Sequence, residues 1–162
     1  MEPAAVVRKG PLLALLAASQ FVVVLDASIV NVALPSIGRD LNFSQDDLSW
    51  VVNAYVLVFG GFLLLGGRLA DLLGRRRLFM TGVLLFTAAS LLCGLAWSPA
   101  ALLAARVVQG AGAAIMTPTA LSIISTTFPE GGERNKAVGI WGAMAGIGAT
   151  AGWLIGGPLV DG

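Results

Sequence analysis

"GGRLADLLGRRRLF", residues 66–79, places four arginines and one aspartate between two apolar runs. The chain around this stretch has 162 residues, of which 57% are hydrophobic and 12% are charged. A soluble domain carries about 25% charged residues. The composition therefore predicts a membrane protein, in which residues 70–77 form a charged hairpin between two membrane-spanning segments.

Five apolar segments are long enough to cross a hydrocarbon core, which takes about 20 helical residues. They cover residues 12–34, 48–69, 78–97, 102–128 and 138–160. Each must be helical, because no water is present in the bilayer to satisfy exposed backbone groups. The sequence thus predicts an all-α membrane protein with five transmembrane helices.

Basic residues gather on one side of this arrangement. Cytoplasmic loops of membrane proteins carry an excess of lysine and arginine. On the other side we find only Arg39, next to three aspartates. We therefore expect a multi-pass protein of the plasma membrane with its N-terminus and the hairpin in the cytoplasm. The basic residues on that side are Arg8, Lys9, Arg68, Arg75, Arg76, Arg77, Arg134 and Lys136.

Several functional classes find no support in the composition. The chain has no histidine and a single cysteine, Cys93, so we expect neither a metal site nor a cofactor. A net charge of +1 gives no basic face for nucleic acid. With no visible pair of nucleophile and base, we do not expect an enzyme.

Two ionisable residues lie inside predicted spans, where charge is costly and usually functional. Asp26 lies 14 residues beyond Leu12, or about 21 Å from the inner face. Arg106 lies four residues into its span from the outer side, which leaves about 24 Å to the inner face of a core about 30 Å thick. Because these depths agree to within one turn, we expect the two side chains to face each other.

The pair has two interpretations. Asp26 and Arg106 could form a proton-sensitive switch, in which separation favours proton uptake and contact favours release. Alternatively, a static pair would only hold two helices together. Four further polar residues could either line a cavity or pack between helices: Asn31, Asn53, Tyr55 and Gln109.

Four motifs in order along the chain resemble those of the major facilitator superfamily. The stretch "GRLADLLGRRRLF" from Gly67 resembles the cytoplasmic signature between its second and third helices. "LDASIVNVALP" (25–35) and "LLAARVVQGAGAA" (102–114) resemble motifs of its first and fourth helices, and "GATAGWLIGG" (148–157) the antiporter motif of the fifth. Together with "WVVNAYVL" (50–57), the set is similar to the fourteen-helix drug-efflux branch.

The resemblance implies roles for two groups of residues. The hairpin would act as a conformational latch, with Asp71 contacting a helix of the other half of the transporter. A glycine face in the fifth segment would pack tightly against its neighbours. Two positions depart from the motifs, Leu72 in place of a basic residue and Trp153 in place of proline. The latch residues are Gly67, Asp71, Gly74, Arg75 and Arg76, and the packing residues are Gly148, Gly152, Gly156 and Gly157.

The family has twelve or fourteen helices, so the resemblance implies a partial N-terminal half-bundle, residues 1–162, that lacks the C-terminal helices of the same transporter. The expected function is proton-coupled efflux of hydrophobic or amphipathic drugs across a bacterial membrane, with a small-molecule substrate, protons and the lipid bilayer as partners. Two alternatives stay open: a non-transporting five-helix scaffold or partner subunit, and an uptake carrier of the same superfamily.

Overall fold

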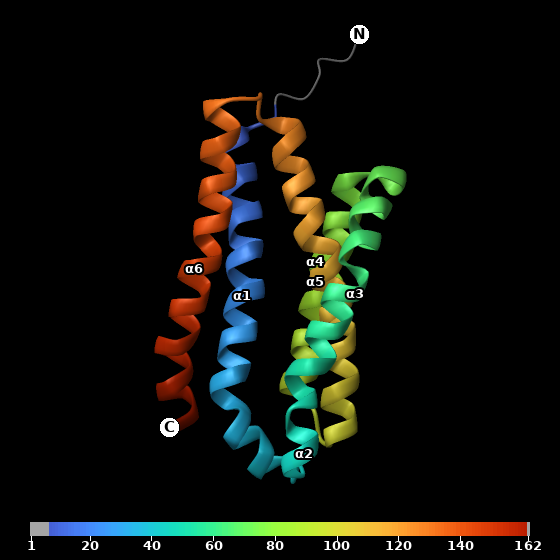
Figure 1. Ribbon diagram of the computed structural model, residues 1–162, viewed down its shortest axis with the longest axis vertical. Helices are drawn as coiled ribbons and strands as arrows, with labels where there is room; N and C mark the ends of the chain where they lie inside the picture. Colours follow the sequence, from blue (N-terminus) through green and yellow to red (C-terminus); the bar gives the residue numbers. More distant parts are fainter. Residues whose placement is uncertain (1–6, 162) are drawn as a thin grey trace.

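A computed structural model describes residues 7–161 and is helical almost throughout (Figure 1). Five of its helices are long and apolar enough to cross a membrane once the short α2 is joined to α3. The chain is therefore an all-α protein with five membrane-length spans. In chain order, the helices of the described residues are α1 (Lys9–Asp40), α2 (Gln45–Leu48), α3 (Trp50–Leu73), α4 (Arg75–Gly94), α5 (Pro99–Thr127) and α6 (Gly132–Asp161).

The helices differ from the predicted spans mainly at their ends. The first span was predicted to end at residue 34, but α1 continues through Pro35 to Asp40. A proline inside a helix removes one backbone hydrogen bond and crowds the preceding turn, which can bend the helix without ending it. The start of α5 follows ordinary capping rules, since Ser98 accepts a hydrogen bond from the Ala101 amide and Pro99 occupies the first turn.

The predicted hairpin is shorter than residues 70–77. Helix α3 extends to Leu73 and α4 begins at Arg75, so Gly74 alone separates the two helices. Gly74 has a φ of 93°, a left-handed conformation that side chains other than glycine rarely adopt. The arginines that we expected in a loop therefore form the first turn of α4.

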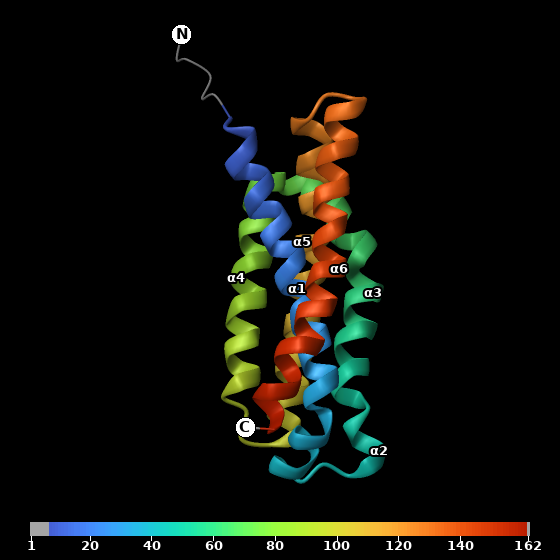
Figure 2. The same cartoon turned by 90° about the vertical axis from the view of Figure 1, so that its left-hand side faces the viewer.

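The long helices form two packed units (Figures 1 and 2). Helix α1 packs along its length on α6, and we call these two helices the α1–α6 pair. Helix α5 packs on both α3 and α4, and these three helices are the α3–α4–α5 group. Contacts between the pair and the group are far sparser than those within each.

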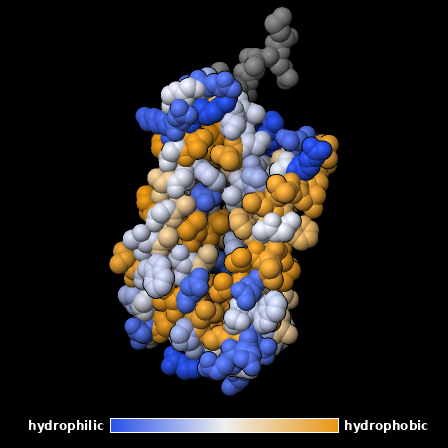
Figure 3. Space-filling model, viewed as in Figure 1, coloured by the Kyte–Doolittle hydropathy of each residue, from blue (hydrophilic) through white to orange (hydrophobic). Residues whose placement is uncertain are grey.

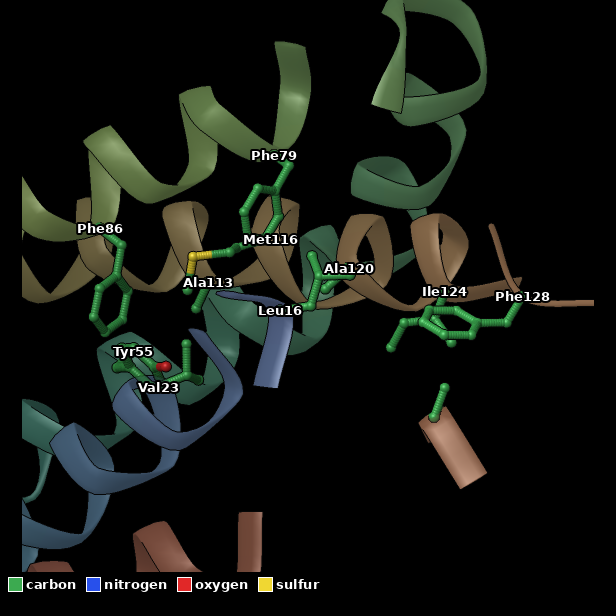
Figure 4. Packing of buried hydrophobic residues seen from close by; sticks show 11 residues of the cluster. Leu16, Val23, Tyr55, Phe79, Phe86, Ala113, Met116, Ala120, Ile124 and Phe128 are labelled. Atoms are coloured by element: carbon green, nitrogen blue, oxygen red, sulfur yellow. The ribbon is translucent and has the colours of Figure 1, made fainter. Parts of the chain in front are cut away.

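Helix α5 lies at the centre of the fold. Half of its most apolar stretch is buried, compared with 11–28% for the other four spans. Figure 4 shows its Met116, Ala120 and Ile124 among buried residues of α1, α3 and α4. Small side chains on α5 allow this central position, because they let several helices approach one axis.

On the face shown in Figure 3, apolar side chains gather mainly along the middle of the molecule and polar ones at both ends. Large side chains such as Leu64 and Leu154 are 88% and 71% exposed. Lipid chains, rather than water, suit such side chains. The surface therefore agrees with a bundle that crosses a bilayer along its long axis.

Candidate functional site: a buried ion pair inside the bundle

Arg106 on α5 is the largest fully buried side chain of the described residues, with 2% of its surface exposed. Its Nε donates a hydrogen bond to the Val51 carbonyl on α3 at 3.0 Å. Its Nη1 donates to Asp26 Oδ2 at 2.8 Å and to Gln109 Oε1 at 2.7 Å. Because a buried charge needs a partner and hydrogen bonds, this set of acceptors explains how an arginine is held inside the bundle.

Asp26 on α1 meets α5 through both of its carboxylate oxygens. While Oδ2 accepts from Arg106, Oδ1 accepts from Gln109 Nε2 at 2.8 Å. Gln109 is fully buried and lies one helical turn beyond Arg106. The expected contact between Asp26 and Arg106 is therefore present, and Gln109 contacts both partners.

Two more helices contribute to the cluster around Arg106. The Tyr55 ring of α3 lies under the guanidinium, with 4.3 Å between Cζ and the ring centroid. The Cys93 thiol of α4 donates to Gln109 Oε1 at 3.5 Å. Side chains from α1, α3, α4 and α5 thus meet at one level of the bundle.

The other two polar candidates lie outside this cluster. Asn31 and Asn53 are exposed, and the Asn31 side chain donates to the carbonyl of Ala27 on its own helix. Of the four residues that we expected either to line a cavity or to pack, Tyr55 and Gln109 pack against Arg106. Neither asparagine contributes to the ion pair.

At the opposite end of α3, the latch candidates surround the Gly74 turn. Asp71 and Arg75 form an exposed ion pair with 3.4 Å between Oδ1 and Nη2. Arg75 also donates through Nε to the Ser122 hydroxyl of α5. Arg76 is exposed, and a side chain added at Gly67 would meet only Pro118 at an ordinary distance. The α3–α5 approach falls instead at Gly66, where an added Cβ would collide with the Ala114 carbonyl.

The glycine motif of α6 lies largely against α1. A Cβ at Gly148 would lie 2.7 Å from the Phe21 carbonyl oxygen, and one at Gly156 3.1 Å from Val32. Gly152 faces Ser28 and Ile29 in the same way. At Gly157, a Cβ would meet nothing within 4 Å among the described residues.

Trp153, where the motif has proline, is 66% exposed on the outside of α6. The helix runs through this position without a break and contains its only internal proline at Pro158. The tryptophan ring is thus directed away from the α1 interface.

Sequence reasoning missed Cys93 as a member of the buried cluster and Gly66 and Gly112 as packing positions. A Cβ at Gly112 would lie 2.7 Å from the Phe86 amide nitrogen of α4. The repeated small residues of "QGAGAA" (109–114) indicated that neighbouring helices could approach α5 closely on two of its faces. Nothing in the sequence indicated that Cys93 would reach Gln109.

Most of the chain is similar in sequence to known bacterial resistance and export proteins. It is 52% identical to the puromycin resistance protein of Streptomyces alboniger and 50% identical to the cephamycin export protein of Amycolatopsis lactamdurans. Each match covers 92% of this chain but only 30% and 31% of those relatives, so the chain spans about a third of their length.

A solved structure agrees in fold. A bacterial homolog of the human lysosomal transporter Spinster superimposes with a TM-score of 0.81 at 26% identity, over 93% of this chain and 32% of that one. The membrane-length helices and bacterial relatives make this chain a multi-pass protein of the plasma membrane, related to transporters rather than to enzymes. Residues 16–162 match the family model of the Major Facilitator Superfamily, and the chain belongs to that family.

Proposed function

We propose that the chain is the N-terminal part of a proton-coupled exporter of hydrophobic or amphipathic compounds. The observation that carries this proposal is the carboxylate of Asp26, held inside a membrane-length bundle by Arg106 and Gln109. Ionisable groups at such depth are costly, and they commonly mark proton or substrate pathways. The names of relatives that resist or export puromycin, cephamycin and tetracenomycin C support export of antibiotics.

The arrangement of the pair suggests how a proton could move the helices. An ionised Asp26 is bound to α5 by charge and by two hydrogen bonds. When it takes a proton, the ionic attraction is lost, but Arg106 keeps the Val51 carbonyl, the Gln109 amide and the Tyr55 ring. The cation then stays with the α3–α4–α5 group while α1 is released. Protonation would therefore loosen the α1–α6 pair from the rest of the bundle.

The orientation forms part of the proposal. The end of the bundle that holds Lys9, the Gly74 turn and the α5–α6 turn is rich in arginine and lysine, and the other end holds mainly aspartates. By the positive-inside rule, the first end and the N-terminus face the cytoplasm. Further helices of the same transporter would complete the bundle, since the relatives are about three times as long.

A second candidate is an uptake carrier for a polar solute. The chain is 40% identical to a riboflavin transporter of Clostridioides difficile over 141 residues. The three antibiotic-related names and the α6 glycine face favour export. A non-transporting scaffold would need no ionisable pair at this depth.

The test is Asp26→Asn in the full-length transporter. Asparagine keeps the shape of the aspartate side chain and one acceptor for Arg106, but its amide does not take up a proton at physiological pH. We expect membrane vesicles with an imposed pH gradient to lose drug export when they hold the same amount of folded transporter as wild type, while drug binding is retained. The matched control is Asp46→Asn, at an exposed aspartate of α2 outside the buried pair. Unchanged gradient-driven export by Asp26→Asn would contradict proton coupling, and solute accumulation in cells would favour the uptake carrier.

A further inference from the structure

A cavity of about 390 Å³ lies between α1, α4 and α5 and reaches the buried ion pair. One water molecule in the bulk liquid occupies about 30 Å³, so the cavity has room for a file of several. Its polar lining consists of Asp26, Asp40, Ser90, Cys93 and Arg106. The rest of the lining is apolar, so water in this space would be held at these polar side chains.

The cavity connects Asp26 with one end of the bundle. On α1 it is lined by Asp26, Val30, Ile37 and Asp40, which recur at helical spacing on a single face. From Asp26 to Asp40 this face measures about 21 Å at 1.5 Å per residue. Asp40 is exposed next to the α1–α2 turn, whereas the side chain of Asp26 is 17% exposed. The carboxylate therefore has access to the end of the molecule that we assign to the outer side.

Other cavities along α1 are unsuited to bring a proton to Asp26. Two that continue between α1 and α4 are lined by apolar residues with Ser19, Thr87 and Ser90, and by no charged side chain. A third, at the cytoplasmic end of the proposed orientation, is lined by Arg75 and Arg76, which repel cations. The cavity at Asp26 instead combines two aspartates with one arginine.

The groups that face Asp26 come from each neighbouring helix. Arg106 and Gln109 of α5 contact Asp26 directly, while Tyr55 of α3 lies against Arg106 and Cys93 of α4 donates to Gln109. Helix α6 faces this part of α1 with Gly148 and Gly152 and places no ionisable residue there. Arg106 is thus the one cation close to Asp26 among the described residues, and the cavity ends where the two meet.

We propose that this cavity is a water-filled entry through which Asp26 exchanges its proton with the outer side. A hydronium ion entering past Asp40 gives its proton to a carboxylate oxygen of Asp26 and leaves a neutral water molecule. The ionic contact with Arg106 is lost in the same step. This inference rests on the proposed proton-coupled export and adds the route by which the proton arrives.

Cys93 reports on the cavity because its thiol lines it. In right-side-out vesicles with the full-length transporter, a small cationic methanethiosulfonate should modify Cys93 faster than its anionic analogue. Asp40→Asn should slow the cationic reagent about two- to fivefold, as expected for loss of one charge several ångströms from the path. The matched control is Asp46→Asn, an exposed aspartate at the same end that does not line the cavity.

Two further variants separate Cys93 from other thiols. Modification that persists in Cys93→Ala belongs to a different cysteine. Ser90→Cys in the Cys93→Ala chain gives a second thiol on the cavity wall without the hydrogen bond to Gln109. If neither Cys93 nor the cysteine at position 90 is modified from the outer side, the cavity is closed to water and the proposal is wrong.

The last measurement links the cavity to coupling. Modified Cys93 should block export driven by a pH gradient and leave drug binding intact, whereas the export that Cys93→Ala retains should be insensitive to the reagent. If export driven by the pH gradient stays normal after complete modification of Cys93, the cavity is not the proton entry. That result would not contradict proton coupling itself. The proposed proton coupling is tested separately: it fails if Asp26→Asn still exports drug in response to the pH gradient.

Discussion

At the scale of single residues, Arg106 explains why an arginine rather than a lysine occupies the centre of the bundle. Its Nε and Nη1 reach Val51 on α3 and Asp26 on α1 at the same time. A guanidinium presents donors in a rigid fork, while an ammonium is a single point of charge on a flexible stem. Arginine thus joins three helices with one side chain.

This geometry predicts how the charges depend on each other. Arg106→Gln leaves Asp26 without its counter-charge, and Asp26→Ala does the same to Arg106. Removing one partner of a buried pair costs about 3–5 kcal/mol, whereas replacing both is often nearly neutral. We expect each single variant to accumulate poorly in membranes, and the double variant Asp26→Ala with Arg106→Gln to recover. Amounts of folded protein after size-exclusion chromatography in detergent measure this. A double variant no better than the worse single one would argue against mutual dependence.

Part of this site could be predicted from the sequence. The depths of Asp26 and Arg106 follow from counting residues along two helices, so their meeting could be predicted. The contributions of Gln109, Tyr55 and Cys93 could not, because they depend on how each helix is rotated about its axis. That rotation is set by packing, and one sequence does not reveal which helix faces which.

At the scale of helices, glycines decide the closest contacts. The spacing of Gly148, Gly152 and Gly156 predicted a tight interface, and the structure adds that α1 is the partner. Helix ends were predicted less well. Length and hydropathy locate the apolar part of each span, but α1 and α6 extend beyond it into residues such as Arg39 and Glu133, which hydropathy does not assign to a span.

Two glycines of α6 provide a matched comparison. A methyl group at Gly148 would lie 2.7 Å from the Phe21 carbonyl oxygen, whereas one at Gly157 has open space. We expect Gly148→Ala to lower stability by about 1–3 kcal/mol, the usual cost of overpacking. Gly157→Ala should be neutral or slightly stabilising, since alanine favours helix. Thermal unfolding midpoints in detergent test both, and equal midpoints would show that α1 and α6 adjust freely to an added methyl group.

At the scale of the whole molecule, the fold divides into the α1–α6 pair and the α3–α4–α5 group, with the Asp26 hydrogen bonds running between them. The number of spans and the class of the fold could be predicted from composition and hydropathy. The division into two units could not, because it pairs the first span with the last. The extensive packing of α1 on α6, with Gly148 and Gly152 in close approach to α1, reveals it.

The Gly74 turn gives a testable prediction about export by the whole transporter. Asp71 and Arg75 form an exposed pair four residues apart, and so do Glu130 and Arg134 at the same end of the bundle. Such pairs contribute only about 0–1 kcal/mol to stability, so neutralising either should leave the fold intact.

If Asp71 also latches a helix of the other half, Asp71→Asn should reduce export about fivefold or more, as a coupling of about 1–3 kcal/mol implies. Glu130→Gln, the matched control, should export normally. Because Asp71 lies at the C-terminal end of α3, where the helix dipole disfavours an anion, its removal should not lower the thermal midpoint. Equal export by the two variants would reduce the turn to a simple connection between α3 and α4.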